Sequence, residues 1–197
     1  MNSSQESPTP VLCDEETDLF PFFDYCTKEA KGINSTLYSS ITFETSYCDP
    51  LAILEQIYRE DQSICYLEKP NNEFSVACGE PVVKASFDGT QRFQEGKIWS
   101  EQLFKQIHLA GDNQVEGTGP TLFLNATFEN ESTEPDLAAL QIFLPHWQVL
   151  RKGGSYYIII NSEISPSSDP NILIEEVART LDRFNQLDDR GPIKQTF

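Results

Sequence analysis

The chain has 197 residues, of which 39% are apolar, including 13 Phe and 7 Tyr, so it can form one domain with a substantial core, or one half of a larger domain. Its 14 basic residues are outnumbered by 31 acidic ones, and the net charge of −17 argues against nucleic acid or an anionic membrane surface as partner. The acidity is most simply interpreted as a means of keeping the protein in solution.

Targeting and cysteine signals point to a soluble cytoplasmic protein. The N-terminus has neither the basic region nor the apolar region of a secretory signal, and no apolar run approaches the roughly 18 residues of a membrane span. The five cysteines form no CxxC pair and lie far in sequence from the two histidines, so neither a disulfide framework nor a metal site of usual spacing is expected. The cysteines are Cys13, Cys26, Cys48, Cys65 and Cys78.

The N-terminal quarter is expected to pass from a tail into the domain. Residues 1–18 are polar and acidic and predict a disordered tail. The apolar patch at residues 19–23 is expected to pack down before the first clear element, a strand at residues 37–44. Asp49 and Pro50 then predict a helix start, with Asp as N-cap and Pro at the first helical position. The buried face of that helix is predicted to carry Leu51, Leu54 and Tyr58.

The next segments predict a hairpin, a strand and a long helix. Strands at residues 63–67 and 73–78 flank a turn rich in Pro and Asn, and a separate strand follows at residues 81–87. A helix is predicted over residues 91–110. The apolar stripe of that helix, Trp99, Leu103 and Ile107, is expected to be core.

The strongest sheet signal lies in residues 138–163. A Gly-containing loop at residues 112–120, without phosphate-loop spacing, and a strand at residues 121–129 precede it. Within it, Gly153 and Gly154 suit a two-residue turn and predict an antiparallel hairpin of residues 147–152 and 155–161 in the sheet interior. Pro145 is expected at a bend or a strand start, because it has no N–H to donate.

The last helix is predicted to start at Asp169 and Pro170 and to run to about residue 187, packed on the sheet. Its apolar stripe is Leu173, Val177, Leu181 and Phe184. Residues 188–197 are expected to be a C-terminal tail. Consecutive strands without intervening helices imply a mainly antiparallel sheet flanked by helices, so the fold class is α+β, with a single domain at residues 19–187.

No catalytic, cofactor-binding or metal-binding residue is assigned. Neither histidine lies in a Ser-His-Asp or Cys-His motif, and His146 is expected to be packed or on the surface. Glu175 and Glu176 are expected on a solvated helix face. Arg151 and Lys152, beside the hairpin turn, have charges that suit a carboxylate, but a solvated turn is the preferred interpretation.

The order of several short segments resembles the N-terminal half of isochorismate synthases, the chorismate-utilising enzymes of menaquinone and phylloquinone synthesis. The resemblance extends over roughly residues 40–187. The segments are residues 49–52, 65–70, 74–79, 92–93, 119–128, 143–147 and 151–161.

This resemblance implies a fold built from two similar halves and a Mg²⁺-dependent isomerisation of chorismate to isochorismate by a general acid, a general base and metal-binding carboxylates. The sequence departs from the family pattern at residues 125–128, where Gly-Gly-Phe is usual, and at His146, where Arg is usual. The segment of the family that carries the base lysine is expected after Phe197, and Lys194 does not match it. No catalytic residue and no cofactor is therefore assigned to this chain; Mg²⁺ is expected for the complete family enzyme.

Three functions remain open. The chain is the N-terminal part of an isochorismate synthase that is inactive alone, or a non-catalytic interaction module that pairs with another chain, or an unrelated binding domain that shares only the strand pattern. The first two predict self-association or binding to a chain that carries the C-terminal half.

Overall fold

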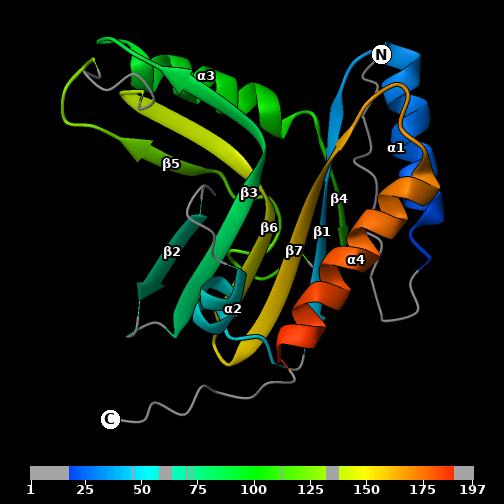
Figure 1. The fold of residues 1–197 in the computed structure, drawn as a ribbon. Coiled ribbons are helices and arrows are strands. Elements are labelled where there is room, and N and C mark those ends of the chain that lie inside the picture. Colours follow the sequence, from blue (N-terminus) through cyan, green and yellow to red (C-terminus); the bar gives the residue numbers. More distant parts are fainter. Residues whose placement is uncertain are drawn as a thin grey trace.

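The computed structural model describes residues 18–45, 47–57, 64–69, 71, 73–111, 113–131 and 138–188. These residues form a seven-stranded sheet of order β2-β3-β6-β7-β1-β4, with β5 paired to β6, and four helices (Figure 1). The strands are β1 Leu37–Thr45, β2 Ile64–Lys69, β3 Phe74–Phe87, β4 Ile107–Gly111, β5 Phe123–Ala126, β6 Leu140–Lys152 and β7 Ser155–Ile164, and the helices are α1 Phe20–Ile33, α2 Pro50–Ile57, α3 Arg92–Phe104 and α4 Pro170–Asp188. Only β1 and β4 pair in parallel, so the predicted α+β class with a mainly antiparallel sheet is confirmed.

The predicted central hairpin is confirmed. Lys152 pairs with Ser155 across a turn in which Gly153 has φ 57° and Gly154 has φ 89°, values that favour glycine. Strand β7 lies between β6 and β1, in the interior of the sheet. The hairpin therefore forms the centre of the sheet, as its continuous apolar runs predict.

Pro145 lies inside β6, at the point where this strand changes its neighbour on one side. Pairing with β5 ends at Phe143, and pairing with β7 starts at Trp147. A residue between those two ladders has no obligatory N–H partner on that side, which explains why proline is tolerated there. The bend that the sequence predicts at Pro145 thus corresponds to the exchange of β5 for β7.

Strand β3 is continuous, although the sequence predicted two strands. The first part of β3 pairs with β2, as the predicted hairpin requires, and both parts pair with β6. A register shift between Pro81 and Val83, with Glu80 at φ 58°, marks a β-bulge rather than a strand end. The prediction was wrong because a bulge and a turn use the same residues.

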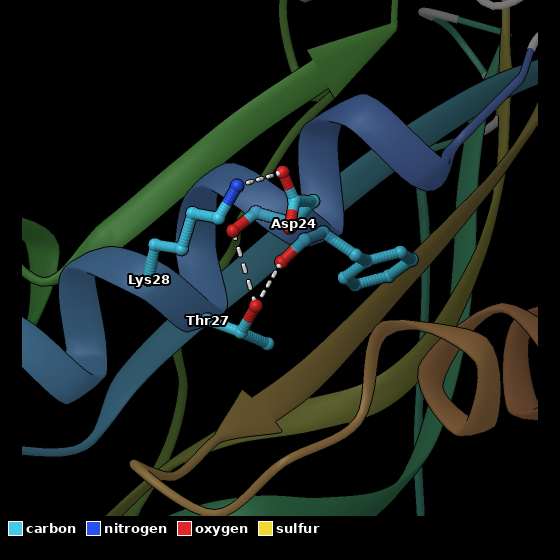
Figure 2. A network of polar contacts seen from close by, with 4 residues as sticks. Asp24, Thr27 and Lys28 are labelled. Carbon is cyan, nitrogen blue, oxygen red and sulfur yellow. Dashed lines mark hydrogen bonds and ion pairs between the residues drawn. The ribbon is translucent and has the colours of Figure 1, made fainter.

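Helix α1 begins within the apolar patch at residues 19–23. The side chains of Phe23, Cys26 and Ala30 are fully buried, at the i, i+3, i+7 spacing of a helix face. Figure 2 shows its polar side, where Lys28 Nζ lies 2.7 Å from Asp24 Oδ2. The hydroxyl of Thr27 donates to the carbonyl oxygen of Phe23, at 2.8 Å. The patch packs down only in part, since Phe23 is buried but Phe20 is 41% exposed. The sequence predicted no helix here, so α1 was missed.

Helix α2 starts where predicted, and Leu54 of the predicted face packs against the core, but the fully buried side chains are others. Asp49 Oδ1 accepts hydrogen bonds from the backbone N–H groups of Leu51 and Ala52, at 2.9 and 3.0 Å. Ile53 and Ile57 are buried, whereas Leu51 is 42% exposed. Tyr58 lies outside the described residues.

Helix α3 is shorter than predicted, because its expected last turns form a strand. Residues 107–111 are β4, which pairs in parallel with β1. The predicted stripe still packs together, since Leu103 is buried in one cluster with Trp99 and Ile107 against it. Ile107 continues the apolar spacing of the helix only by coincidence. The pairing of residues 107–111 with β1 determines that they form a strand. Strand β5 is likewise shorter than the predicted residues 121–129.

The two faces of the sheet have separate cores. One core contains side chains of α1, α2 and α4 together with Trp147, Val149 and Ile160 of the central hairpin. In Figure 1, α2 and α4 lie across the sheet, with α1 beside α4, and α3 lies at the far end of β3 and β6. The predicted stripe of α4 is confirmed, with Leu173, Val177 and Phe184 buried in this core and Leu181 packed against it.

The predicted tails fall mostly outside the described part of the chain: residues 1–17 and 189–197 are not described. No candidate membrane-spanning helix is found among the described residues.

Candidate functional site

The second face of the sheet carries a group of buried polar side chains. Because side chains alternate along a strand, Gln148 and Leu150 point away from the α1/α2/α4 core that holds Trp147 and Val149. Gln148 pairs with Ile159 of β7, and Ile159 pairs with Thr42 of β1. We call the four residues Ser40, Thr42, Gln148 and Asn161 the polar belt.

Strand register places the belt residues on one face. Ser40 pairs directly with Asn161, and directly paired residues in an antiparallel sheet point to the same side. Along β6, Gln148 falls between Leu144 and Leu150, which belong to two different apolar clusters. The belt therefore lies between two apolar clusters on this face, one that contains Leu150 and one that contains Leu144.

Three belt atoms have no hydrogen-bond partner within the described structure: Ser40 Oγ, Gln148 Nε2 and Asn161 Oδ1. The side chains that carry them are at most 1% exposed. A buried polar group without a partner costs about 1–3 kcal/mol, so such groups commonly mark an ordered water or a polar ligand.

Thr42 ties the belt to the loop that follows β4. Its Oγ1 donates to Asn113 Oδ1 and accepts from the backbone N–H of Gly119, both at 3.1 Å. Asn113 Nδ2 in turn donates to the carbonyl oxygen of Gly111 at 3.0 Å. A Cβ on Gly111, at φ +80°, would lie 2.0 Å from the carbonyl oxygen of Thr42, so only glycine allows this approach.

The belt offers neutral donors and acceptors and no charge. It can therefore bind water, hydroxyl or amide groups, but it has no cation to neutralise a carboxylate. Mg²⁺ requires carboxylate or other oxygen ligands. In the described ranges, no three or more His, Cys, Asp or Glu residues are placed to hold a metal ion. The residues described here do not fit Mg²⁺, and no chemical step is assigned to that ion in this chain.

Both histidines are held by neighbouring elements. The ring of His146 lies with Nδ1 2.8 Å from the carbonyl oxygen of Asn161 and Nε2 3.2 Å from Thr180 Oγ1, so it links the sheet to α4. The sequence predicted a packed or a surface position, and the ring is half-buried between these two elements. His108 Nε2 on β4 lies 3.4 Å from Glu29 Oε2 on α1.

Arg151 and Lys152, the charged residues beside the hairpin turn, differ in their contacts. Lys152 Nζ lies 2.7 Å from Glu116 Oε2 and packs over the ring of Phe74. This ion pair lowers the pKa of the Glu116 carboxyl. Arg151 is half-buried, and its Nε is buried without a partner in the described structure, so its side chain is less solvated than a turn position suggests. On α4, Glu175 is exposed, as expected of a solvated face, whereas Glu176 is only partly exposed.

A protein-family profile described as "chorismate binding enzyme" matches residues 25–196. The chain belongs to the chorismate-binding enzyme family. The match covers nearly the whole described region, from the second turn of α1 through α4. No curated protein matches the sequence at a significant level.

The sequence did not predict the polar belt. Its members come from three strands, of which β1 is distant from β6 and β7 in the chain, and only Gln148 is a single polar residue within an apolar run. The available signal was polarity inside those runs: Gln148 and Asn161 stand inside the strongest strand patterns, where an uncompensated polar residue is costly.

Proposed function

We propose that this member of the chorismate-binding enzyme family provides the N-terminal scaffold of an isochorismate synthase, and that it does not isomerise chorismate by itself. The observation that carries the proposal is the family match over residues 25–196, joined to the ordered segments that resemble isochorismate synthases. The reaction adds water at one side of the ring while the 4-hydroxyl leaves from the other, and it requires an acid, a base and metal-binding carboxylates.

The chemistry of the described residues supports the division of labour in this proposal. The buried polar side chains of the belt are uncharged, and the imidazole of His146 is engaged by Asn161 and Thr180. A second chain or segment would then bring the acid–base groups and the metal ligands. Loss of each acid–base group typically reduces turnover ~10²–10⁴-fold.

The test is formation of isochorismate from chorismate with Mg²⁺, by the purified chain alone and after mixing with the C-terminal half of an isochorismate synthase. We expect no turnover above background from the chain alone. Metal-dependent turnover that disappears when one carboxylate of this chain is changed would show that the active site lies here. Turnover that appears only in the mixture would support the scaffold role directly.

A second candidate is a non-catalytic interaction module. It is favoured by exposed apolar side chains near β5, where Leu124 is 59% exposed and Phe128 is fully exposed. The mixing experiment separates the two candidates, because a module binds the other half without producing turnover.

A further inference from the structure

Two cysteines face each other across the edge of the sheet. Cys65 on β2 pairs directly with Cys78 on β3, and both are free thiols. The Cys78 thiol donates a hydrogen bond to the sulfur of Cys65, which, beside the larger effect of burial, lowers the pKa of Cys65 and raises that of Cys78. Directly paired residues of antiparallel strands have Cβ atoms roughly 4.5–5.5 Å apart and point to the same face.

The two thiols differ in access. Cys65 is partly exposed on β2, an edge strand with β3 as its only neighbour in the described sheet. Cys78 is fully buried and pairs on its other side with Gln148 of the polar belt. A reagent in solution therefore meets Cys65 first, and Cys78 is in position to react with whatever forms on Cys65.

We propose that Cys65 and Cys78 form a modification site, at which a small disulfide such as oxidised glutathione converts the thiol pair into an intramolecular disulfide. The Cys65 thiol loses its proton to solvent, and its sulfur attacks one sulfur of the oxidant. The S–S bond of the oxidant breaks, and one glutathione leaves as the thiol. The Cys78 sulfur, after losing its proton, then attacks the Cys65 sulfur of the mixed disulfide and releases the second glutathione. Two protein thiols are oxidised, and one glutathione disulfide is reduced to two thiols.

The geometry near β2 can accommodate the bond. A disulfide needs Cβ atoms roughly 3.5–4.5 Å apart, slightly closer than in a relaxed strand pair. Strand β2 is short and is held on one side only, so it can move toward β3 without displacing another strand. Cys26 and Cys48 belong to the core on the other face, so neither competes as a partner.

Burial sets the speed of this reaction. Burial raises the pKa of the Cys65 thiol, although the hydrogen bond from Cys78 opposes the shift. Burial also raises the pKa of Cys78. Because the thiolate is the nucleophile, closure should be slow near neutral pH and should accelerate roughly tenfold per pH unit below the thiol pKa.

The experiment uses the reduced full chain, incubated with oxidised glutathione, quenched with an alkylating reagent and weighed intact. Cleavage after Glu68 and Glu73 then separates the two cysteines into different peptides. We expect a linked pair of peptides containing Cys65 and Cys78, with no persistent glutathione adduct on either of them. Denaturing the protein in urea before oxidation should remove the preference for this pair, and a reducing agent should restore both thiols.

Three variants decide the proposal, each checked first for native melting behaviour. Cys78→Ser should trap glutathione on Cys65, and Cys65→Ser should leave Cys78 unmodified. Cys26→Ser, the matched control on the other face, should form the linked pair at the wild-type rate. A stable adduct on Cys65 of the wild type, or a native chain whose two thiols never link, would overturn the proposal.

Discussion

Gln148 occupies the middle of the polar belt with its amide nitrogen buried and unpaired within the described structure. Its neighbours across the strands are Cys78 and Ile159, neither of which competes strongly for that N–H. Such a group either binds an ordered water or ligand, or it reduces the stability of the fold. Substitution distinguishes the two cases.

We expect Gln148→Met to leave the free energy of unfolding unchanged or to raise it by about 1–3 kcal/mol, because a similar volume is kept and an unpaired amide is removed. Urea denaturation measures the change. Leu150→Ala, two residues along the same strand face, is the comparison and should cost ~2–5 kcal/mol. A clear loss of stability in Gln148→Met would instead mean that the amide binds a partner such as water.

Cys26 provides a test of burial through pH. Burial, with a smaller contribution from the carboxylate of Glu29, raises the pKa of its thiol from 9.0 to about 12. The native state thus favours the neutral thiol. The contribution of this thiol to the free energy of unfolding is fully present below the unfolded-state pKa, and it is lost as pH rises from about 9 toward about 12.

Over that range the free energy of unfolding of the wild type should fall by about 1.4 kcal/mol more per pH unit than that of Cys26→Ala, because the variant has no thiol at this position to titrate. Urea midpoints of both proteins between pH 7 and 10 give the difference, which cancels the titration of lysines and tyrosines. Parallel pH curves would contradict the buried, neutral thiol.

Among the elements, the hairpins and the helix starts that depend on neighbouring residues were predicted, but helix α1 was missed, and pairings between distant segments were not predicted. The glycine turn after Lys152 and the caps of α2 and α4 depend on residues adjacent in sequence, so the pattern predicts them. Strand β4 has the spacing of a helix stripe at Ile107 and becomes a strand only because β1 offers a free edge. The polar belt is missed for the same reason, because no single-sequence pattern shows that Ser40 meets Asn161.

Helix α4 allows a matched test of packing. Leu173 is 5% exposed, whereas its neighbour Ile172 is 54% exposed on the same helix. Leu173→Ala should lower the free energy of unfolding by about 2–5 kcal/mol through lost burial and a cavity. Ile172→Ala should change it by less than about 0.5 kcal/mol. Equal effects in chemical denaturation would mean that α4 does not pack through the face seen here.

At the scale of the molecule, the described residues leave apolar surface and strand edges uncovered. The edge strands at the two ends of the strand order carry exposed leucines, with Leu67 on β2 47% exposed and Leu109 on β4 40% exposed. Exposed apolar groups beside unpaired strand edges favour association. An uncovered face of roughly 500 Å² would correspond to on the order of 10 kcal/mol of burial, before the costs of association.

We therefore predict that the chain self-associates or binds a chain carrying the other half of the fold, and that self-association strengthens with ionic strength. The net charge of −17 repels two copies, and salt screens this repulsion while leaving apolar burial in place. Sedimentation across protein and salt concentrations, with and without the other half, measures the effect. Leu67→Lys or Leu109→Lys should weaken association even though each reduces the repulsion between copies, whereas Ile172→Lys on α4 should not weaken it. A monomer under all conditions that binds neither itself nor the other half would mean that the chain closes its own core and is not half of a larger fold.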